Sequence, residues 1–324
     1  MPGGEERELK RRIKSVENTK QVTKAMEMIA SARLPKAQER VAAARPYSEK
    51  ITEVIARLAD EGADLDHPLL AQRDEDEIDK VAFVVITSDR GLAGAYNNNV
   101  VRAASRALDE HRRKGRDYSL VLIGRKAESY FRFRDYTIDA YFSGLTEKPA
   151  YEDARRVADA VTGPFEEGEV DLVLLIYTQF LSMSTQQVVV RQFLPLDTEA
   201  LTDQVQEERE GLRPAYEFEP TPTEILARLL PRYVEARLYA ALLDAAASEL
   251  VMRQRAMKAA TDNAEELITN LSREMNRARQ ATITTEIMEI VGGAEALREG
   301  GGEAEEILSL LANSGVMPDY FPVS

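Results

Sequence analysis

The sequence predicts an α/β fold in which long N- and C-terminal helices form an antiparallel coiled coil beside a central α/β domain with a largely parallel sheet. Apolar residues recur at heptad spacing over about 5–60 and again over about 222–298, as in helices that pack on a partner helix. Short β-branched runs alternate with helical segments over about 80–215, which favours strands covered on both faces. We therefore expect four parts: 1–60, 80–215, 222–298 and an extension over 299–324.

The first helical pattern carries its apolar seam from Leu9 to Leu58. Three successive heptad positions are polar: Lys20, Thr23 and Glu27. The apolar residues of that stretch lie one step away: Val22, Met26 and Ile29. This change of face predicts contact with a different surface, and a small irregularity of register explains it equally well. Pro35 and Pro46 each remove an intrahelical hydrogen bond, so we expect kinks there or a break at Pro46.

The C-terminal pattern is stronger, with apolar residues at most heptad positions from Leu229 to Ala278. A helix of roughly 75 residues would be about 110 Å long, which exceeds a compact domain of this size. Because a lone amphipathic helix cannot hide its stripe, the two terminal helices are expected to pair. Beyond Ala278 the apolar residues move over by one: Ile283, Ile287, Ile290, Ala294 and Leu297. This shift indicates that the shorter first helix has ended and that another surface meets the tip.

The middle of the chain alternates between strands and helices. Four runs are strand candidates: 81–87, 119–124, 171–177 and 186–196. Three segments between them are predicted as helices: 98–114, 125–133 and 151–164. The acidic stretch 197–220 is predicted to be a mobile loop, and the glycine-containing extension 299–324 is predicted to hold a short helix.

Composition excludes several kinds of chemistry. The 324 residues contain no cysteine and only two histidines, so a thiolate site is impossible and a histidine-based metal site or triad is poorly supplied. No apolar run reaches the length of a membrane-spanning helix, and the first residues carry no secretory signal, which predicts an intracellular protein. The net charge is −14, yet 7–45 and 253–279 are rich in Lys and Arg. These basic helices favour an acidic partner or a solvated face over nucleic acid.

The candidate ligand site is the loop SDRGLAGAYNNN (88–99), which follows the first predicted strand. It lacks the glycine spacing of dinucleotide-binding and P-loop motifs, so a tight turn is the preferred interpretation. In that turn glycine would supply a positive φ, and Asn97 or a neighbour would cap the next helix. GRKAES (124–129) could hold an anion or simply begin a helix. No acid–base constellation stands out along the chain.

Four stretches in order along the chain resemble the γ subunit of F-type ATP synthase of the bacterial type. They are LKRRIKSVENTKQVTKAMEMIASARL (9–34), SDRGLAGAYNNN (88–99), SELVMRQRAMKAATDNAEELI (248–268) and ARQATITTEIMEIVGGAEAL (278–297). The resemblance implies a rotor whose coiled coil enters a ring of α and β subunits, with a Rossmann-like domain at the foot beside the ε subunit and the c-ring. It implies a non-catalytic subunit without cofactor or metal that couples proton-driven c-ring rotation to the catalytic β subunits. It also implies a peripheral protein at the cytoplasmic face of the cell membrane, with membrane contact only through the c-ring.

The resemblance also carries functional positions over to this sequence. Residues expected to face the β subunits are Lys24, Met26, Glu27, Arg279, Gln280, Thr284 and Glu286. The expected apolar bearing at the helix tip comprises Ile283, Ile287, Ile290 and Leu297. The family usually ends near Leu297, so the further residues of this chain are a departure, either a regulatory arm or a mobile extension. Two alternatives are a stand-alone α/β enzyme or ligand-binding domain with a helical dimerisation stalk, and a nucleic-acid-binding coiled coil.

Overall fold

The computed structural model describes residues 3–60, 67–196, 219 and 221–299. The predicted loop 197–220, apart from residue 219, and the extension beyond Glu299 lie outside this part of the chain. The chain divides into two compact units, one of residues 24–259 and one of residues 1–23 with 260–324. Each unit is described separately below.

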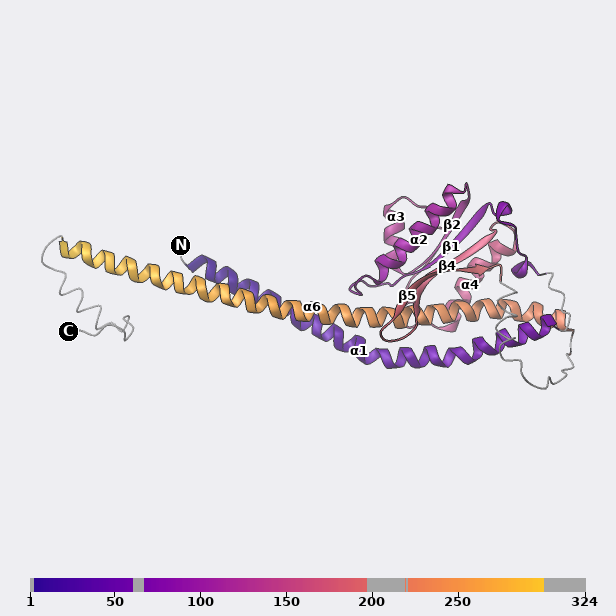
Figure 1. The fold of residues 1–324 in the computed structure, drawn as a ribbon, viewed down its shortest axis with the longest axis horizontal. Coiled ribbons are helices and arrows are strands. Elements are labelled where there is room, and N and C mark those ends of the chain that lie inside the picture. The colour runs from indigo at the N-terminus through magenta and orange to yellow at the C-terminus, as the bar shows by residue number, and fades with distance from the viewer. Residues whose placement is uncertain (1–2, 61–66, 197–218, 220, 300–324) are drawn as a thin grey trace. The chain divides into compact units, whose positions relative to one another are not determined.

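The helices and strands follow the predicted order (Figure 1). The helices are α1 (Gly3–Asp60), α2 (Tyr96–Arg113), α3 (Arg125–Phe133), α4 (Tyr151–Glu166) and α6 (Pro222–Glu299), with short turns η1 (Pro68–Leu70) and η2 (Glu75–Glu77). The strands are β1 (Lys80–Ile86), β2 (Asp117–Ile123), β3 (Ala140–Phe142), β4 (Leu172–Phe180) and β5 (Gln186–Leu194). All of these strands were predicted from the sequence except β3, which has three residues.

The sheet has the order β3-β2-β1-β4-β5, in which only β5 is antiparallel to its neighbour. Alternate residues of β1 point to opposite faces because side chains in a strand repeat every two residues. Val81, Phe83 and Val85 join the core with α2 and α3. Ala82 and Val84 join the other core, which includes α4, the end of α1 and the start of α6. Helices thus cover both faces, which confirms the α/β class.

In the unit of residues 24–259, α1 and α6 pack along a third apolar cluster that includes Leu34, Val41, Leu243 and Val251. The helix α1 continues through Pro35 and Pro46, so the predicted break at Pro46 is wrong. Both prolines are exposed, which leaves the packed face of the helix free of their rings.

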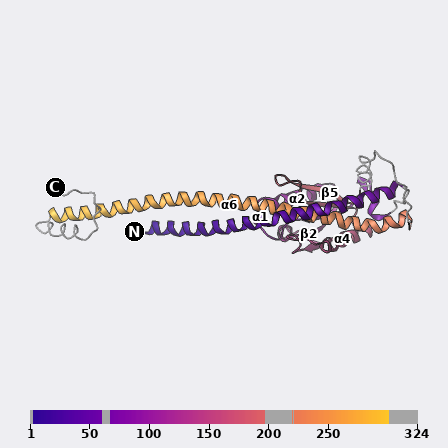
Figure 2. The same ribbon diagram turned by 90° about the horizontal axis from the view of Figure 1, so that it is seen from below.

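In the unit of residues 1–23 and 260–324, the two helices run antiparallel (Figure 2). The hydroxyl groups of Thr23 and Thr261 hydrogen-bond at 2.9 Å, and Lys20 forms a 3.3 Å ion pair with Glu265. Buried residues repeat at seam spacing along both helices: Leu9, Thr23, Thr261, Ala264 and Leu271. The predicted antiparallel coiled coil is therefore confirmed.

The structure corrects the predicted change of face around residues 20–29. Thr23 is 8% exposed, whereas Val22 and Ile29 are 54% and 53% exposed. The heptad seam therefore continues through its polar positions, because Thr23 satisfies its hydroxyl group with Thr261. Of the apolar residues one step away, Val22 and Ile29 are exposed and Met26 is half-buried.

Candidate partner-binding surfaces

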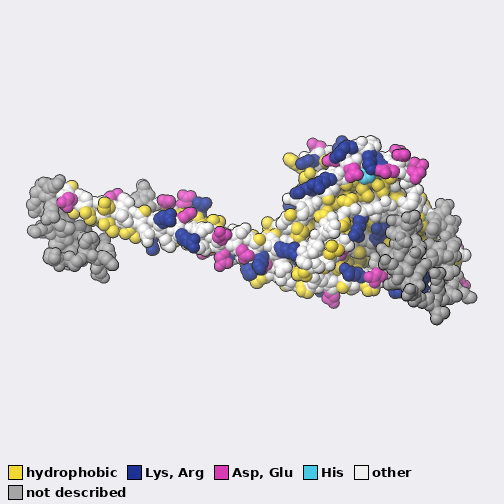
Figure 3. Space-filling view, in the orientation of Figure 1, with side chains coloured by type: hydrophobic (Ala, Val, Ile, Leu, Met, Phe, Trp, Pro, Cys, Tyr) yellow, Lys and Arg dark blue, Asp and Glu magenta, His cyan; other side chains and the backbone are white. Residues whose placement is uncertain are grey.

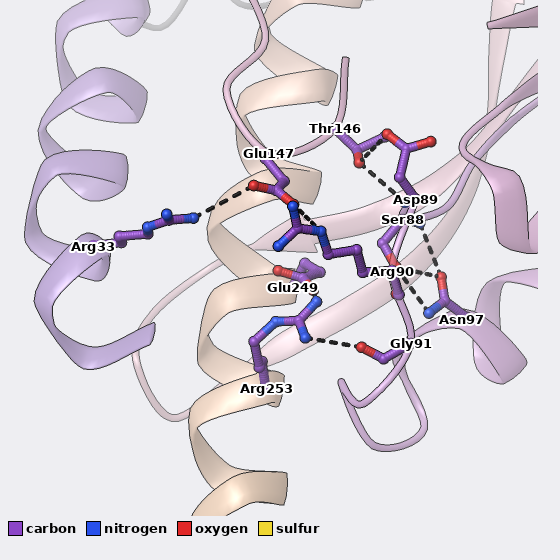
Figure 4. A network of polar contacts seen from close by, with 10 residues as sticks. All are labelled: Arg33, Ser88, Asp89, Arg90, Gly91, Asn97, Thr146, Glu147, Glu249 and Arg253. Carbon is purple, nitrogen blue, oxygen red and sulfur yellow. Dashed lines mark hydrogen bonds and ion pairs between the residues drawn. The ribbon is translucent and has the colours of Figure 1, made fainter. Parts of the chain in front are cut away.

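Loops at the carboxyl ends of the parallel strands close over the site where many α/β folds bind a ligand. Asp89, which follows β1, organises them (Figure 4). Its carboxylate accepts hydrogen bonds from the backbone N–H of Gly144 at 2.8 Å and of Arg125 at 3.2 Å, and from the Thr146 hydroxyl at 3.0 Å. The Thr146 hydroxyl oxygen also accepts from the Asp89 N–H at 3.1 Å. The polar groups of this edge therefore bind one another.

The loop of residues 88–99 also docks on α6. Arg253 donates a 2.8 Å hydrogen bond to the Gly91 carbonyl and pairs with Glu249 one turn earlier (Figure 4). Gly94 lies beside α6 as well: a Cβ atom built on it would lie 3.4 Å from the Cβ of Ala256, which is van der Waals contact. Two of the stretches that carry the family resemblance, 88–99 and 248–268, are thus in direct contact. Sequence analysis missed this contact, since the two stretches are far apart along the chain.

The tight turn contains the predicted positive-φ glycine, but Asn97 does not cap the following helix. Gly94 has a φ of +58°, the positive value expected of a tight-turn glycine. Asn97 does not cap α2, because its side-chain oxygen accepts the N–H of Ser88 at 2.9 Å. The cap position is Ala95, which offers no side-chain hydrogen bond. Asn97 thus fixes the start of the loop.

Two buried ionisable groups lie beneath this junction. Burial raises the pKa of Glu249, and the neighbouring Arg253 opposes the shift. Burial also raises the pKa of the Tyr96 phenol, with the nearby Glu249 charge adding to it. Among the described residues, no group of three His, Asp or Glu side chains could hold a metal ion. The helix α3 begins at Arg125 directly after Gly124, so the stretch GRKAES does begin a helix.

The residues expected to face β subunits on the first helix lie at its surface. Lys24 is exposed and forms a 3.1 Å ion pair with Glu27, one turn away on the same helix. Met26 is half-buried, and the neighbouring Met28 is exposed. The predicted set did not contain Met28. The only indication of it in the sequence is that Met28 is one more apolar residue outside the heptad seam. This part of α1 offers a mixed apolar and basic surface.

The second predicted group lies on α6, in the other compact unit, and every member is exposed: Arg279, Gln280, Thr284 and Glu286. The Thr284 hydroxyl donates to the Gln280 carbonyl at 2.9 Å, as threonine often does within a helix. The pKa of Glu6 is lowered chiefly by a hydrogen bond from Lys10, and Arg279 of the opposite helix contributes. Arg279 therefore lies at the level of the first turns of α1.

The last described turns of α6 extend past the start of α1. Continuing the antiparallel register from the Lys20–Glu265 pair places Gly3 opposite Thr282. Beyond that level Ile283, Ile287 and Ile290 are 47%, 41% and 44% exposed, and hydrophobic side chains remain visible there (Figure 3). Met288 and Val291 are exposed as well, and the sequence analysis did not include them. The side chain of Leu297 lies outside the described part.

Comparisons with known proteins agree on one family. A family model described as ATP synthase matches residues 5–297. The ATP synthase gamma chain of Parafrankia sp. (strain EAN1pec) is 50% identical over 301 residues, which are 92% of this chain and 99% of that protein. The gamma chain of Acidothermus cellulolyticus is 49% identical over 306 residues, or 93% of this chain and 100% of that protein.

Solved structures show the same fold. The chain is similar to one in the cryo-EM structure of the Euglena gracilis mitochondrial ATP synthase described as OSCP/F1/c-ring, with a TM-score of 0.63 and 18% identity. That match covers 99% of this chain and 100% of the other. A chain in the rotor structure of the same enzyme matches with a TM-score of 0.60 and 17% identity, over 87% and 99% of the two chains.

Proposed function

The chain belongs to the γ-subunit family of F-type ATP synthase, the rotor of the central stalk, and from this premise we propose how its residues transmit rotation. The helix pair turns within the ring of α and β subunits, and its exposed surfaces press on the β subunits in succession. The α/β domain receives torque from the ε subunit and the c-ring. The subunit itself performs no chemistry, and it lies at the cytoplasmic face of the cell membrane.

The observation that carries this proposal is the exposed apolar end of α6. Contiguous exposed apolar side chains are unusual on a protein that acts alone, and they mark an interaction site. Here they begin where α1 no longer accompanies α6, at Ile283. No helix of the described residues has an apolar stretch suited to crossing a bilayer. We therefore assign these side chains to contact with the catalytic ring.

The stand-alone ligand-binding alternative places its ligand at the loop of residues 88–99. Polar groups of that loop bind other groups of the protein. The Asp89 carboxylate accepts from Gly144, and the Asn97 side-chain oxygen accepts from Ser88. The Gly91 carbonyl accepts from Arg253. Because the chain belongs to the γ-subunit family, we prefer the rotor function to this alternative. Asp89 and Arg90 accordingly have a structural part to play.

Co-purification with the cognate α and β subunits, followed by an ATPase assay, tests the assignment. We expect a stable complex whose ATP hydrolysis requires all three subunits, and no hydrolysis by the chain alone. The Asp89→Asn variant, if folded, should support the same turnover in this complex. Failure to form a complex with α and β subunits would contradict the proposal.

A triple substitution tests the tip. Replacing Ile283, Ile287 and Ile290 with serine should change the stability of the isolated subunit by less than about 0.5 kcal/mol per site, because these side chains are exposed. The same variant should lower ATP synthesis and ATP-driven proton pumping by the assembled enzyme. Thermal unfolding and pumping assays measure the two effects. Glu289→Gln, which changes an exposed polar residue of the same turns, is the control and should be close to wild type.

A further inference from the structure

Residues 144–151, which connect β3 to the first residue of α4, contact α1, α6 and the loop that follows β1. We propose that this segment fixes the rotational position of the α/β domain on the helix pair, with Glu147 as its positioning residue. The inference rests on the proposed rotor function, since a fixed angle matters where torque crosses the junction. All residues that carry it belong to the compact unit of residues 24–259.

Two arginines of α1 hold the segment from one side. Arg33 forms an ion pair with Glu147 at 3.4 Å, and Arg40 donates to the Pro149 carbonyl (the first pair is drawn in Figure 4). Arg33 and Arg40 are seven residues apart, so both lie on the same face of the helix, two turns from each other. Two contacts separated along the axis resist tilting as well as sliding, which a single contact does not.

The carboxylate of Glu147 joins α1 to the loop that follows β1. One oxygen accepts from Arg33, and the other forms a 2.7 Å ion pair with Nε of Arg90. Arg90 follows Asp89, whose carboxylate is bound to Gly144 and Thr146 of the segment. A displaced segment would therefore break contacts with α1 and with the sheet edge together.

The segment reaches α6 at its other end. The Tyr151 hydroxyl donates to Glu235 at 2.9 Å, and its ring meets the ring of Tyr239 edge-on with centroids 5.5 Å apart. Glu235 is buried and is also paired with Arg232 at 3.0 Å. A hydrogen bond from a phenol to a carboxylate depends on direction. Residues 144–151 thus have oriented contacts with both long helices.

Oriented contacts are needed here because the apolar cores do not set an angle sharply. Hydrophobic burial is non-directional and responds to the area removed from water. The clusters beneath the sheet hold the α/β domain against α1 and α6, while ion pairs and hydrogen bonds select one orientation among similar packed ones. Because Arg33, Arg90 and Glu147 are partly exposed, removing this bridge should raise the population of displaced orientations by about two- to fivefold.

Spin labels measure the orientation directly in the assembled complex. The chain has no cysteine, so single cysteines at the exposed positions Lys36 on α1 and Arg106 on α2 can be labelled without background. We expect one narrow distance distribution in the parent protein and a broader or displaced one in Glu147→Gln. The double variant Arg33→Gln/Arg40→Gln should broaden it in the same way. Adding Glu147→Gln to Arg33→Gln should produce less than the sum of the two single effects.

Function is measured on the same variants. ATP hydrolysis and complex assembly should be unchanged, while protons pumped per ATP should fall against an opposing gradient. Glu152→Gln is the matched control: Glu152 is exposed, and Arg155, with which it forms an ion pair, lies on the same helix. Unchanged distance distributions in both Glu147→Gln and the double arginine variant would overturn the inference. Loss of assembly in the parent protein would instead contradict the proposed rotor function.

Discussion

Replacing Gly124 with alanine is expected to destabilise the subunit by about 3–4 kcal/mol, the largest single-residue effect anticipated here. Gly124 has a φ of +93°, where an L side chain is strained. A Cβ atom there would lie 2.4 Å from the Thr87 carbonyl oxygen, a backbone atom that cannot rotate away. The Thr87 hydroxyl oxygen accepts the Ala127 N–H at 2.9 Å, so displacement of Thr87 would disturb the start of α3. Urea unfolding of the isolated subunit measures the change.

Alanine substitutions at two other glycines distinguish the cost of backbone strain from the cost of steric collision. Gly115 has a φ of +81° with open space around its Cβ position, so Gly115→Ala should cost about 1 kcal/mol from strain alone. Gly163 lies in α4 without positive φ or neighbouring atoms, so Gly163→Ala should stabilise by about 0.5–1 kcal/mol. Equal losses in Gly115→Ala and Gly124→Ala would show that the collision with Thr87 has no effect.

Replacing Asp244 with asparagine should stabilise the protein at neutral pH by about 2–3 kcal/mol. Asp244 lines a groove of about 490 Å³ between α1, α6 and the end of β4. Burial raises its pKa from 3.8 to about 6, while the charges of Arg45 and Arg191 and the Phe180 N–H oppose the shift. Because the folded pKa exceeds the unfolded one, its contribution to stability is present below about pH 4. That contribution is lost as the pH rises through about 6.

The asparagine amide keeps an oxygen that can accept the Phe180 N–H and carries no charge. The difference in unfolding free energy between Asp244→Asn and wild type should therefore grow from near zero at pH 4 to its full value at pH 7. Chemical denaturation at several pH values measures this difference. Asp159→Asn, at an exposed position of α4, is the control. A difference that is constant over this range would contradict the assignment to Asp244.

The regular elements could be predicted because their signals are local and repeated. The seam from Leu229 to Ala278 is buried or half-buried at every predicted heptad position. Strands β1, β2 and β4 are short apolar runs whose buried character follows from helices on both faces. The strand β3 was missed because Ala140–Phe142 is short and its residues are only partly buried or exposed. Only its pairing with β2 identifies it as a strand, because its own sequence does not indicate one.

The contacts between segments could not be predicted in the same way. Thr23 is polar in an apolar pattern, and its seam position became understandable only with Thr261 opposite it. The role of Asp89 depends on backbone N–H groups of other loops, which the sequence does not distinguish from any others. The shift of apolar residues at Ile283 was informative because it coincides with the level at which the antiparallel helix α1 starts. The positions expected to face β subunits remain predictions, which assays on the assembled complex can test.

The overhang of α6 beyond α1 has a mechanical consequence. Two helices packed side by side resist bending more than one, since each must stretch or compress along its length when the pair curves. Opposite residues 3–23 of α1 the helix α6 has this support, and past Thr282 no described residue of α1 supplies it. Elastic bending should therefore concentrate in the final turns of α6. These turns can bend toward a binding surface that lies off the helix axis, while the paired part of the helix stays straight.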